Sequence, residues 1–268
     1  PRLSNFDLAE INLQAREENQ WHIPDSEFEK LLDPSVKAFI LVNPSNPGSR
    51  SLTDESLEQL RKVVVKRPDL IIITDDVYGT FVNGFRTVYS VCPRNTILVY
   101  SYSKLYGVTG WRLGVIAINE DNVFDELIKK LPEKKKKELE SDYSIVTLNP
   151  SEMSFVDRIC ADSRSIGLYH TSGLSTPQQI MMVLLSMTHL VLENEKDQYI
   201  EACKEITAIR YHNLMSTLGL PEDNSDSNAK YYTLIDIYQL AETNYDKNFA
   251  TWLRNEFEEI DFLLHLAK

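Results

Sequence analysis

Cysteine is scarce in this sequence, which contains only Cys92, Cys160 and Cys203. The three are widely spaced and form no C-x-x-C pair, which argues against a disulfide framework and a structural zinc site and favours a reducing, cytoplasmic setting. Long apolar runs are also missing. A membrane-spanning helix needs roughly 18 consecutive apolar residues, and the most apolar stretch, residues 180–192, is interrupted by polar side chains. We therefore expect a buried helix there and no membrane association.

Positive charge is in deficit, with 28 Lys and Arg against 40 Asp and Glu and a formal net charge of -12. Such a field repels polyanions, so general binding of nucleic acid or anionic membranes is not expected, and an anionic ligand would need a local site. Glycine is sparse as well, with nine residues. Neither a G-x-G-x-x-G nor a Walker pattern occurs, which disfavours nucleotide binding.

The first half of the chain alternates between apolar runs and polar connections. The runs at residues 37–42, 70–76, 96–101 and 113–118 are typical of buried strands. Between the first two, Leu57, Leu60 and Val64 recur at helical spacing before Pro68. This alternation predicts an α/β fold with a mostly parallel sheet and helices on both faces.

Beyond residue 121 the pattern becomes more helical. We expect helices over 122–131, 176–194 and 197–217, a solvated charged segment over 132–142, a turn-rich segment over 221–230 and a strand over 231–238. A domain boundary near residue 218 would divide the chain into a large domain, 1–217, incomplete at its N-terminus, and part of a smaller α+β domain, 218–268.

Chemically useful side chains follow the predicted strands, where loops and ligands of α/β sheets meet. They are Asn46, Asp75, Tyr78, Ser101, Ser103, Lys104 and Arg112. A lysine forms a Schiff base with an aldehyde, a guanidinium with a serine hydroxyl suits a phosphate, and a carboxylate keeps a pyridine nitrogen protonated. This set suits pyridoxal 5'-phosphate and includes no metal site.

Three motifs, NPSNP, DDVY and SYSKLYGVTGWRLG, occur in this order. Through them the sequence resembles the fold type I pyridoxal-phosphate enzymes of the aspartate aminotransferase class. The resemblance implies that Lys104 bonds covalently to the cofactor and acts as general base. It also implies that Asp75 pairs with the pyridine nitrogen, and that Tyr78 and Asn46 contact the phenolic oxygen. Ser101 and Arg112, with Ser103, would hold the phosphate.

Within that class, VNPSNP, TDDVYGTFVNGFR, GWRLGVIAI and residues 161–179 are most similar to the aspartate 4-decarboxylases, over about residues 23–220. The implied enzyme acts on amino acids and 2-oxo acids: it transaminates aspartate, decarboxylates it to alanine, or both, as a homodimer or higher homo-oligomer. Three alternatives remain: an aminotransferase of other specificity, a non-catalytic fragment or regulatory domain of the same fold, and a generic α/β ligand-binding domain.

The sequence departs from the family pattern at Gly48 and Ser49, where Thr-Gly is common, so we expect this loop to close differently. The resemblance places the second phosphate loop and the ring-stacking aromatic upstream of residue 1, and the α-carboxylate arginine in the small domain. Loss of early strands would expose sheet edges or apolar faces. His170 and Arg164 are further candidates for the site, whereas Asp76 is read as structural.

Overall fold

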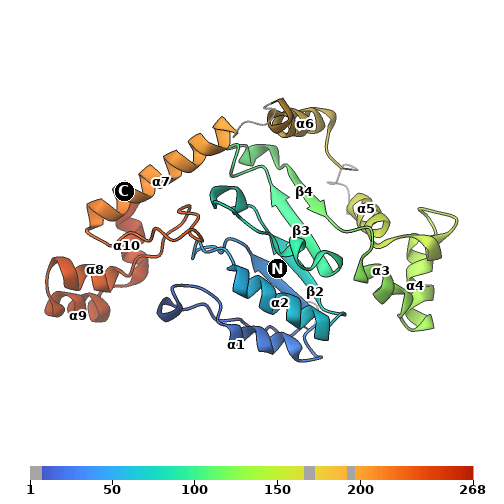
Figure 1. The fold of residues 1–268 in the computed structure, drawn as a ribbon, viewed down its shortest axis with the longest axis horizontal. Coiled ribbons are helices and arrows are strands. Elements are labelled where there is room, and N and C mark those ends of the chain that lie inside the picture. Colours follow the sequence, from blue (N-terminus) through green and yellow to red (C-terminus); the bar gives the residue numbers. More distant parts are fainter. Residues whose placement is uncertain (1–7, 166–172, 192–196, 268) are drawn as a thin grey trace.

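A four-stranded sheet lies at the centre of the computed structural model, which describes residues 8–165, 173–191 and 197–267 (Figure 1). The strands are β1 (Ala38–Val42), β2 (Ile71–Asp75), β3 (Thr96–Ser101) and β4 (Gly114–Ala117). Their order is β1-β2-β3-β4. The first three are parallel and β4 is antiparallel to β3. The α/β class and the mostly parallel sheet are thus confirmed.

Helices precede, connect and follow the strands. They are α1 (Asp25–Phe28), α2 (Asp54–Lys66), α3 (Val123–Lys129), α4 (Glu133–Tyr143), α5 (Phe155–Ser165), α6 (Thr176–Val191), α7 (Gln198–Leu218), α8 (Ile237–Asn244), α9 (Lys247–Glu256) and α10 (Glu259–Leu266). Figure 1 shows α1 and α2 beside the sheet, α3 to α5 at one end, and α7 leading towards α8 to α10 at the other. The helices predicted around 176–194 and 197–217 correspond to α6 and α7. None of the helices within the described ranges is long and apolar enough to span a bilayer.

Helix α2 follows from its sequence. The Thr53 side chain caps its N-terminus by accepting a hydrogen bond from the Ser56 backbone N–H. Leu57, Leu60 and Val63 lie on one face and are buried, as the helical spacing of apolar residues predicts. The charged segment that follows β4 also folds as expected: α4 is a solvated helix with Lys135–Glu138 and Lys136–Glu133 ion pairs.

The main hydrophobic core lies between α2 and one face of the sheet. Phe39, Leu41 and Ile72 project from the strands towards Leu57 and Leu60 of α2, and all are buried. Because side chains alternate along a strand, the neighbouring residues of β1 and β2 project to the opposite face.

Truncation of this core gives a stability prediction. Leu60 is fully buried, so Leu60→Ala is expected to lower the free energy of unfolding by about 2–5 kcal/mol through lost burial and the remaining cavity. Val65 lies on the same helix but is 70% exposed, so Val65→Ala is expected to change it by at most about 0.5 kcal/mol. Chemical denaturation of both variants checks this; similar effects of the two would contradict the assigned burial.

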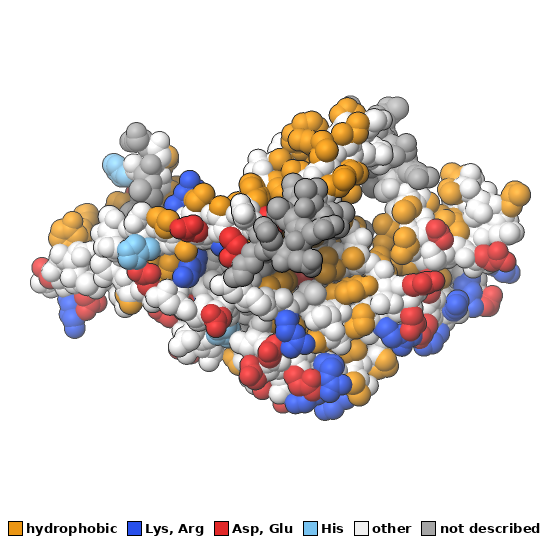
Figure 2. Space-filling view, turned by 45° about the horizontal axis from the view of Figure 1, so that its top comes forward, with side chains coloured by type: hydrophobic (Ala, Val, Ile, Leu, Met, Phe, Trp, Pro, Cys, Tyr) orange, Lys and Arg blue, Asp and Glu red, His pale blue; other side chains and the backbone are white. Residues whose placement is uncertain are grey.

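The opposite face of the sheet is more open. Ile40, Val42 and Ile116 on this face are exposed, so the helices among the described residues do not bury it as they bury the α2 side. Figure 2 shows a second gathering of hydrophobic side chains over α6. Its exposed members are Ile180, Val183, Leu184 and Met187. The helix expected over residues 180–192 therefore forms, but the prediction that it is buried is wrong, because no described segment covers these four side chains.

The prediction of a strand over residues 231–238 is wrong. Residues 232–236 form no regular element, and α8 begins at Ile237. A strand needs a neighbouring strand to take up its backbone hydrogen bonds. In the described part of the chain, the N–H groups of Tyr231 and Tyr232 instead donate to the Ser49 side chain.

Candidate cofactor site

The sheet brings the predicted site residues to one edge. In the register of the three parallel strands, Val42, Asp75 and Val99 are neighbours, and Ser101 is paired with Gly114 of β4. Asp75 is therefore the last residue of β2 and Ser101 the last of β3. Both lie on the open face, opposite the main core, because they occupy the same alternating positions as Val99.

Two adjacent carboxylates, Asp75 and Asp76, have different surroundings. Asp75 is half-buried, and its Oδ1 accepts a hydrogen bond from the Val77 N–H at 3.1 Å. Asp76 is only 4% exposed, and its Oδ1 accepts a hydrogen bond from Thr74 Oγ1 at 2.5 Å. Burial raises the pKa of Asp76, against hydrogen bonds from Thr74 and Thr87 that lower it. Asp75 can thus face a ligand, whereas Asp76 belongs to the interior.

The turn after β3 presents Lys104 beside two serines. Ser101 Oγ donates a hydrogen bond to Ser103 Oγ at 3.0 Å and accepts one from the Ser103 N–H at 3.2 Å. Lys104 is half-buried, and within the described ranges no carboxylate or hydrogen-bond acceptor pairs with its ammonium group. Its amine is therefore not engaged by another described side chain and is available for reaction with an aldehyde.

Arg112 lies just before β4, across from the same turn. Its backbone is left-handed, with φ 54° and ψ 48°. The guanidinium is exposed and Nη1 donates to the Thr109 carbonyl at 3.3 Å, while the described residues provide no carboxylate partner for it. Gly114 keeps β4 close to β3, because a Cβ at this position would lie 3.0 Å from the Tyr100 carbonyl. Arg112 thus precedes Leu113, whose carbonyl accepts a hydrogen bond from Ser101 Oγ at 3.4 Å, and a guanidinium with serine hydroxyls is a donor set suited to a phosphate.

Tyr78 and Asn46 are placed differently from one another. Tyr78 is 4% exposed, and its hydroxyl lies 2.8 Å from the hydroxyl of Tyr232. Asn46 is exposed in the loop after β1, and among the described residues it shares no hydrogen bond with Tyr78. Asp75 lies close enough to Tyr78 to act on its pKa, whereas Asn46 is exposed on the loop after β1.

The loop after β1 closes through Ser49, one of the residues that depart from the family pattern. Ser49 is 2% exposed with φ 60°, and its N–H donates to the Ser45 carbonyl at 2.8 Å. The sequence motifs assign no site role to Ser49 or to Tyr232. The departure at Ser49 was a usable signal, but the Tyr232 contact spans 154 residues and leaves none.

Two other candidates from the sequence are not placed. His170 lies outside the residues that the structure describes, and the side chain of Arg164 lies outside them too.

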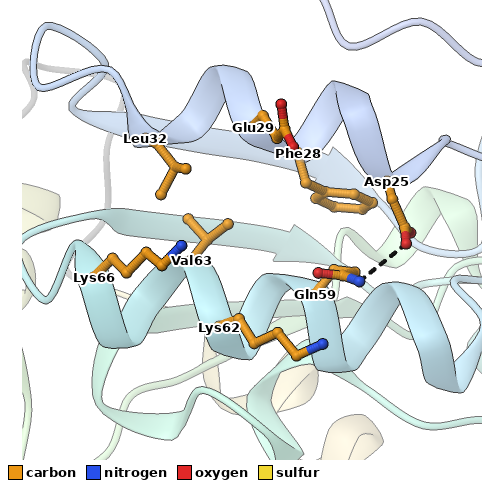
Figure 3. Close-up of a pocket in the computed structure, with 8 residues that line it drawn as sticks. All are labelled: Asp25, Phe28, Glu29, Leu32, Gln59, Lys62, Val63 and Lys66. Atoms are coloured by element: carbon orange, nitrogen blue, oxygen red, sulfur yellow. Dashed lines mark hydrogen bonds between the residues drawn. The ribbon is translucent and has the colours of Figure 1, made fainter.

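Cavities elsewhere in the described residues offer less chemistry. A groove of about 280 Å³ lies between α1 and α2, where Gln59 Nε2 donates to Asp25 Oδ2 at 2.9 Å (Figure 3). Its lining residues are Asp25, Phe28, Glu29, Leu32, Gln59, Lys62, Val63 and Lys66. These side chains do not bring together a nucleophile, a base and an anion site. No group of three or more metal-ligating side chains occurs in the part of the chain that the structure describes.

The sequence matches the aminotransferase class I and II family over residues 2–136, half of the chain, and the chain belongs to this family. Members of the family are enzymes that use pyridoxal phosphate and act on small amino and 2-oxo acids.

The chain is similar to several individual aminotransferases. The chain is 45% identical over its whole length to a bifunctional aspartate aminotransferase and L-aspartate β-decarboxylase of a Pseudomonas species, and covers 50% of that protein. It is 34% identical over 41% of its length to an aromatic-amino-acid aminotransferase of Thermococcus litoralis, covering 29% of it. The structure of aspartate aminotransferase from Thermus thermophilus with maleate matches 81% of this chain and 47% of its own, with a TM-score of 0.55 and 18% identity. The chain thus spans about half the length of the Pseudomonas relative.

The residues present fit the family's cofactor. The donor set consists of a half-buried lysine that is unpaired among the described residues, a carboxylate with one oxygen held by a backbone N–H, a buried phenol, a guanidinium and two serine hydroxyls. These are the groups that an aldehyde, a pyridine nitrogen, a phenolic oxygen and a phosphate require.

Proposed function

We propose that this chain supplies the lysine side of a pyridoxal-phosphate site that acts on aspartate, by transamination, by β-decarboxylation to alanine, or by both. The observation that carries the proposal is the half-buried Lys104, without an ionic partner among the described residues, in the turn beside Ser101 and Ser103. The identity of 45% to the bifunctional Pseudomonas enzyme over the whole chain favours aspartate as the substrate.

Each residue of the edge has a role in holding the cofactor. Lys104 would bond to its aldehyde carbon, and Asp75 would pair with the pyridine nitrogen. Tyr78 and Asn46 would bind the ring oxygen. Arg112, Ser101 and Ser103 would bind the phosphate, for which a guanidinium and hydroxyl donors are well matched.

Lys104 also has a role in proton transfer. When bound, the cofactor acts as an electron sink for the pair released at the substrate Cα. The amine of Lys104, exchanged for the substrate amine, would take the Cα proton as a general base. The carboxylate of Asp75 would stabilise the positive charge on the ring nitrogen through Coulomb attraction in a partly desolvated setting.

The proposal also covers the domains, the oligomeric state and the cellular location of the protein. Residues 1–217 would belong to the cofactor-binding large domain and residues 218–268 to part of the small domain. A homodimer or higher homo-oligomer is proposed, since sites near a subunit interface are implied by the family resemblance. A cytoplasmic location is proposed from the few, scattered cysteines.

A second candidate is an aminotransferase with another preference, supported by the match to the aromatic-amino-acid aminotransferase. Product analysis of the purified protein with pyridoxal phosphate and a 2-oxo acid separates the two. We expect oxaloacetate, or alanine with CO2, from aspartate, and little turnover of aromatic amino acids. Faster turnover of aromatic amino acids than of aspartate would favour the second candidate, and a Lys104→Ala preparation gives the background rate.

A further inference from the structure

Tyr78 is held by a residue far along the chain. Its hydroxyl lies 2.8 Å from the hydroxyl of Tyr232, and the two rings meet edge to face with centroids 5.2 Å apart. The ring of Tyr231 also packs against Tyr78, with centroids 5.0 Å apart. The phenol of Tyr78 is thus enclosed by two aromatic rings but hydrogen-bonded to only one of them.

The position of Tyr232 is fixed by the loop after β1. Ser49 Oγ accepts hydrogen bonds from the N–H groups of Tyr231 and Tyr232, each at 3.2 Å. The Ser49 carbonyl accepts another from the Ala229 N–H at 2.9 Å. The buried hydroxyl of Ser49 therefore ties the NPSNP loop to the backbone that carries Tyr232.

Arg50 and Ser51, next to Ser49, also bond to the segment before Tyr232. We call this set of contacts between residues 49–51 and 223–232 the junction. Arg50 forms an ion pair with Asp223, and its Nη1 donates to Ser225 Oγ at 2.8 Å. The N–H of Ser51 donates to the Ser227 carbonyl at 2.9 Å. Because these bonds flank the Tyr232 segment on its N-terminal side, a change in the Tyr232 hydroxyl alone leaves the junction intact.

The direction of the hydrogen bond between Tyr78 and Tyr232 determines where the hydroxyl proton of Tyr78 points. A phenol has one proton to donate and lone pairs to accept with. Burial raises the pKa of Tyr78, with Tyr232, Tyr231 and Asp75 as the titratable groups that face it and act in the same direction. Tyr78 therefore stays protonated at neutral pH. If Tyr232 donates to the Tyr78 oxygen, the single Tyr78 proton is directed away from Tyr232.

We propose that Tyr232 is a positioning residue: its hydroxyl donates to the oxygen of Tyr78 and so aims the Tyr78 proton at the ring oxygen of the cofactor. This inference rests on the proposed pyridoxal-phosphate site. Tyr231, which packs on Tyr78 without bonding to its hydroxyl among the described residues, fills space and provides the matched control.

The test follows the pH at which the bound cofactor changes its absorption spectrum. A hydrogen bond donated to the ring oxygen stabilises its anionic form, so loss of that bond raises the midpoint. For Tyr78→Phe we expect a rise of about 1–2 pH units. For Tyr232→Phe we expect a smaller rise, about 0.5 unit, since the donor remains but is less well directed. Both replacements keep the ring, and thermal unfolding confirms that each variant is folded.

Two further variants separate positioning from packing. Tyr231→Phe is expected to leave the midpoint as in the unmodified protein. The double variant Y78F/Y232F is expected to match Tyr78→Phe alone, because Tyr232 acts through Tyr78. A Tyr232→Phe midpoint equal to that of the unmodified protein, or full additivity in the double variant, would overturn the inference. If the unmodified protein bound no cofactor, the proposed function itself would fail, which is a different result from binding with an unshifted Tyr232→Phe.

Discussion

Replacement of Lys104 by alanine is expected to abolish the covalent bond between the protein and pyridoxal phosphate and to lower aspartate turnover by roughly 10²–10⁴-fold. Alanine offers no amine to the aldehyde and no base to the substrate Cα. Because Lys104 makes no ion pair within the described residues, the free energy of unfolding should change by only about 0.5 kcal/mol or less. Steady-state rates and denaturation curves measure the two effects.

Lys204 provides the matched control for this substitution. It is also half-buried, but its Nζ is engaged with Asn83 at 3.1 Å and Glu201 at 3.4 Å on the surface of α7. Lys204→Ala should leave both the adduct and the turnover close to their original levels. Turnover by Lys104→Ala within a few-fold of the unmodified protein would remove Lys104 from the mechanism.

Asp75→Asn is expected to produce the second largest loss, a fall in aspartate turnover of roughly 10²–10³-fold. Asparagine keeps the shape of the side chain and its bond to the Val77 N–H, but loses the charge that would hold a proton on the cofactor ring. Binding of the cofactor should weaken as well. Spectroscopic titration with pyridoxal phosphate and steady-state kinetics report these two effects separately.

Asp76 provides the control for Asp75, because it carries the same carboxylate at a position in the interior. Asp76→Asn should leave turnover within a few-fold, since Asp76 is bonded to Thr74 in the interior. The substitution Asp76→Asn should instead change how the free energy of unfolding depends on pH. Burial raises the pKa of Asp76 in the folded protein above the ordinary value of an aspartate. The free energy of unfolding should therefore be highest below the ordinary pKa and fall as the pH rises through the raised pKa. Asparagine does not titrate and removes this dependence. Equal losses of turnover at Asp75 and Asp76 would contradict the assigned site.

Much of the fold was predictable because local patterns and tertiary demands agree. Apolar runs of strand length mark β1 to β3 to within a residue or two, and the helical spacing of Leu57 and Leu60 marks the buried side of α2. The parallel order then places Asp75 and Ser101 at one edge without further information. The lysine, the carboxylate and the serines of the candidate site can therefore be proposed from the sequence.

What could not be predicted depends on contacts between distant segments. Residues 231–238 have a strand-like composition, but Ser49 takes the N–H groups that a neighbouring strand would need. Tyr232 is an ordinary aromatic residue in the sequence, and only the fold brings its hydroxyl to Tyr78. Asn46 shares a motif with the site, yet the loop leaves it exposed, because motif spacing does not determine which way a loop side chain points.

Lys104 is the residue that we propose to carry pyridoxal phosphate. The most direct test is to incubate the purified protein with pyridoxal phosphate, reduce it with borohydride, and measure the intact mass and the modified peptide. We predict one reduced pyridoxyl group, on the peptide that contains Lys104, and none in Lys104→Ala. Modification of other lysines only, or no modification of the protein at all, would contradict the account.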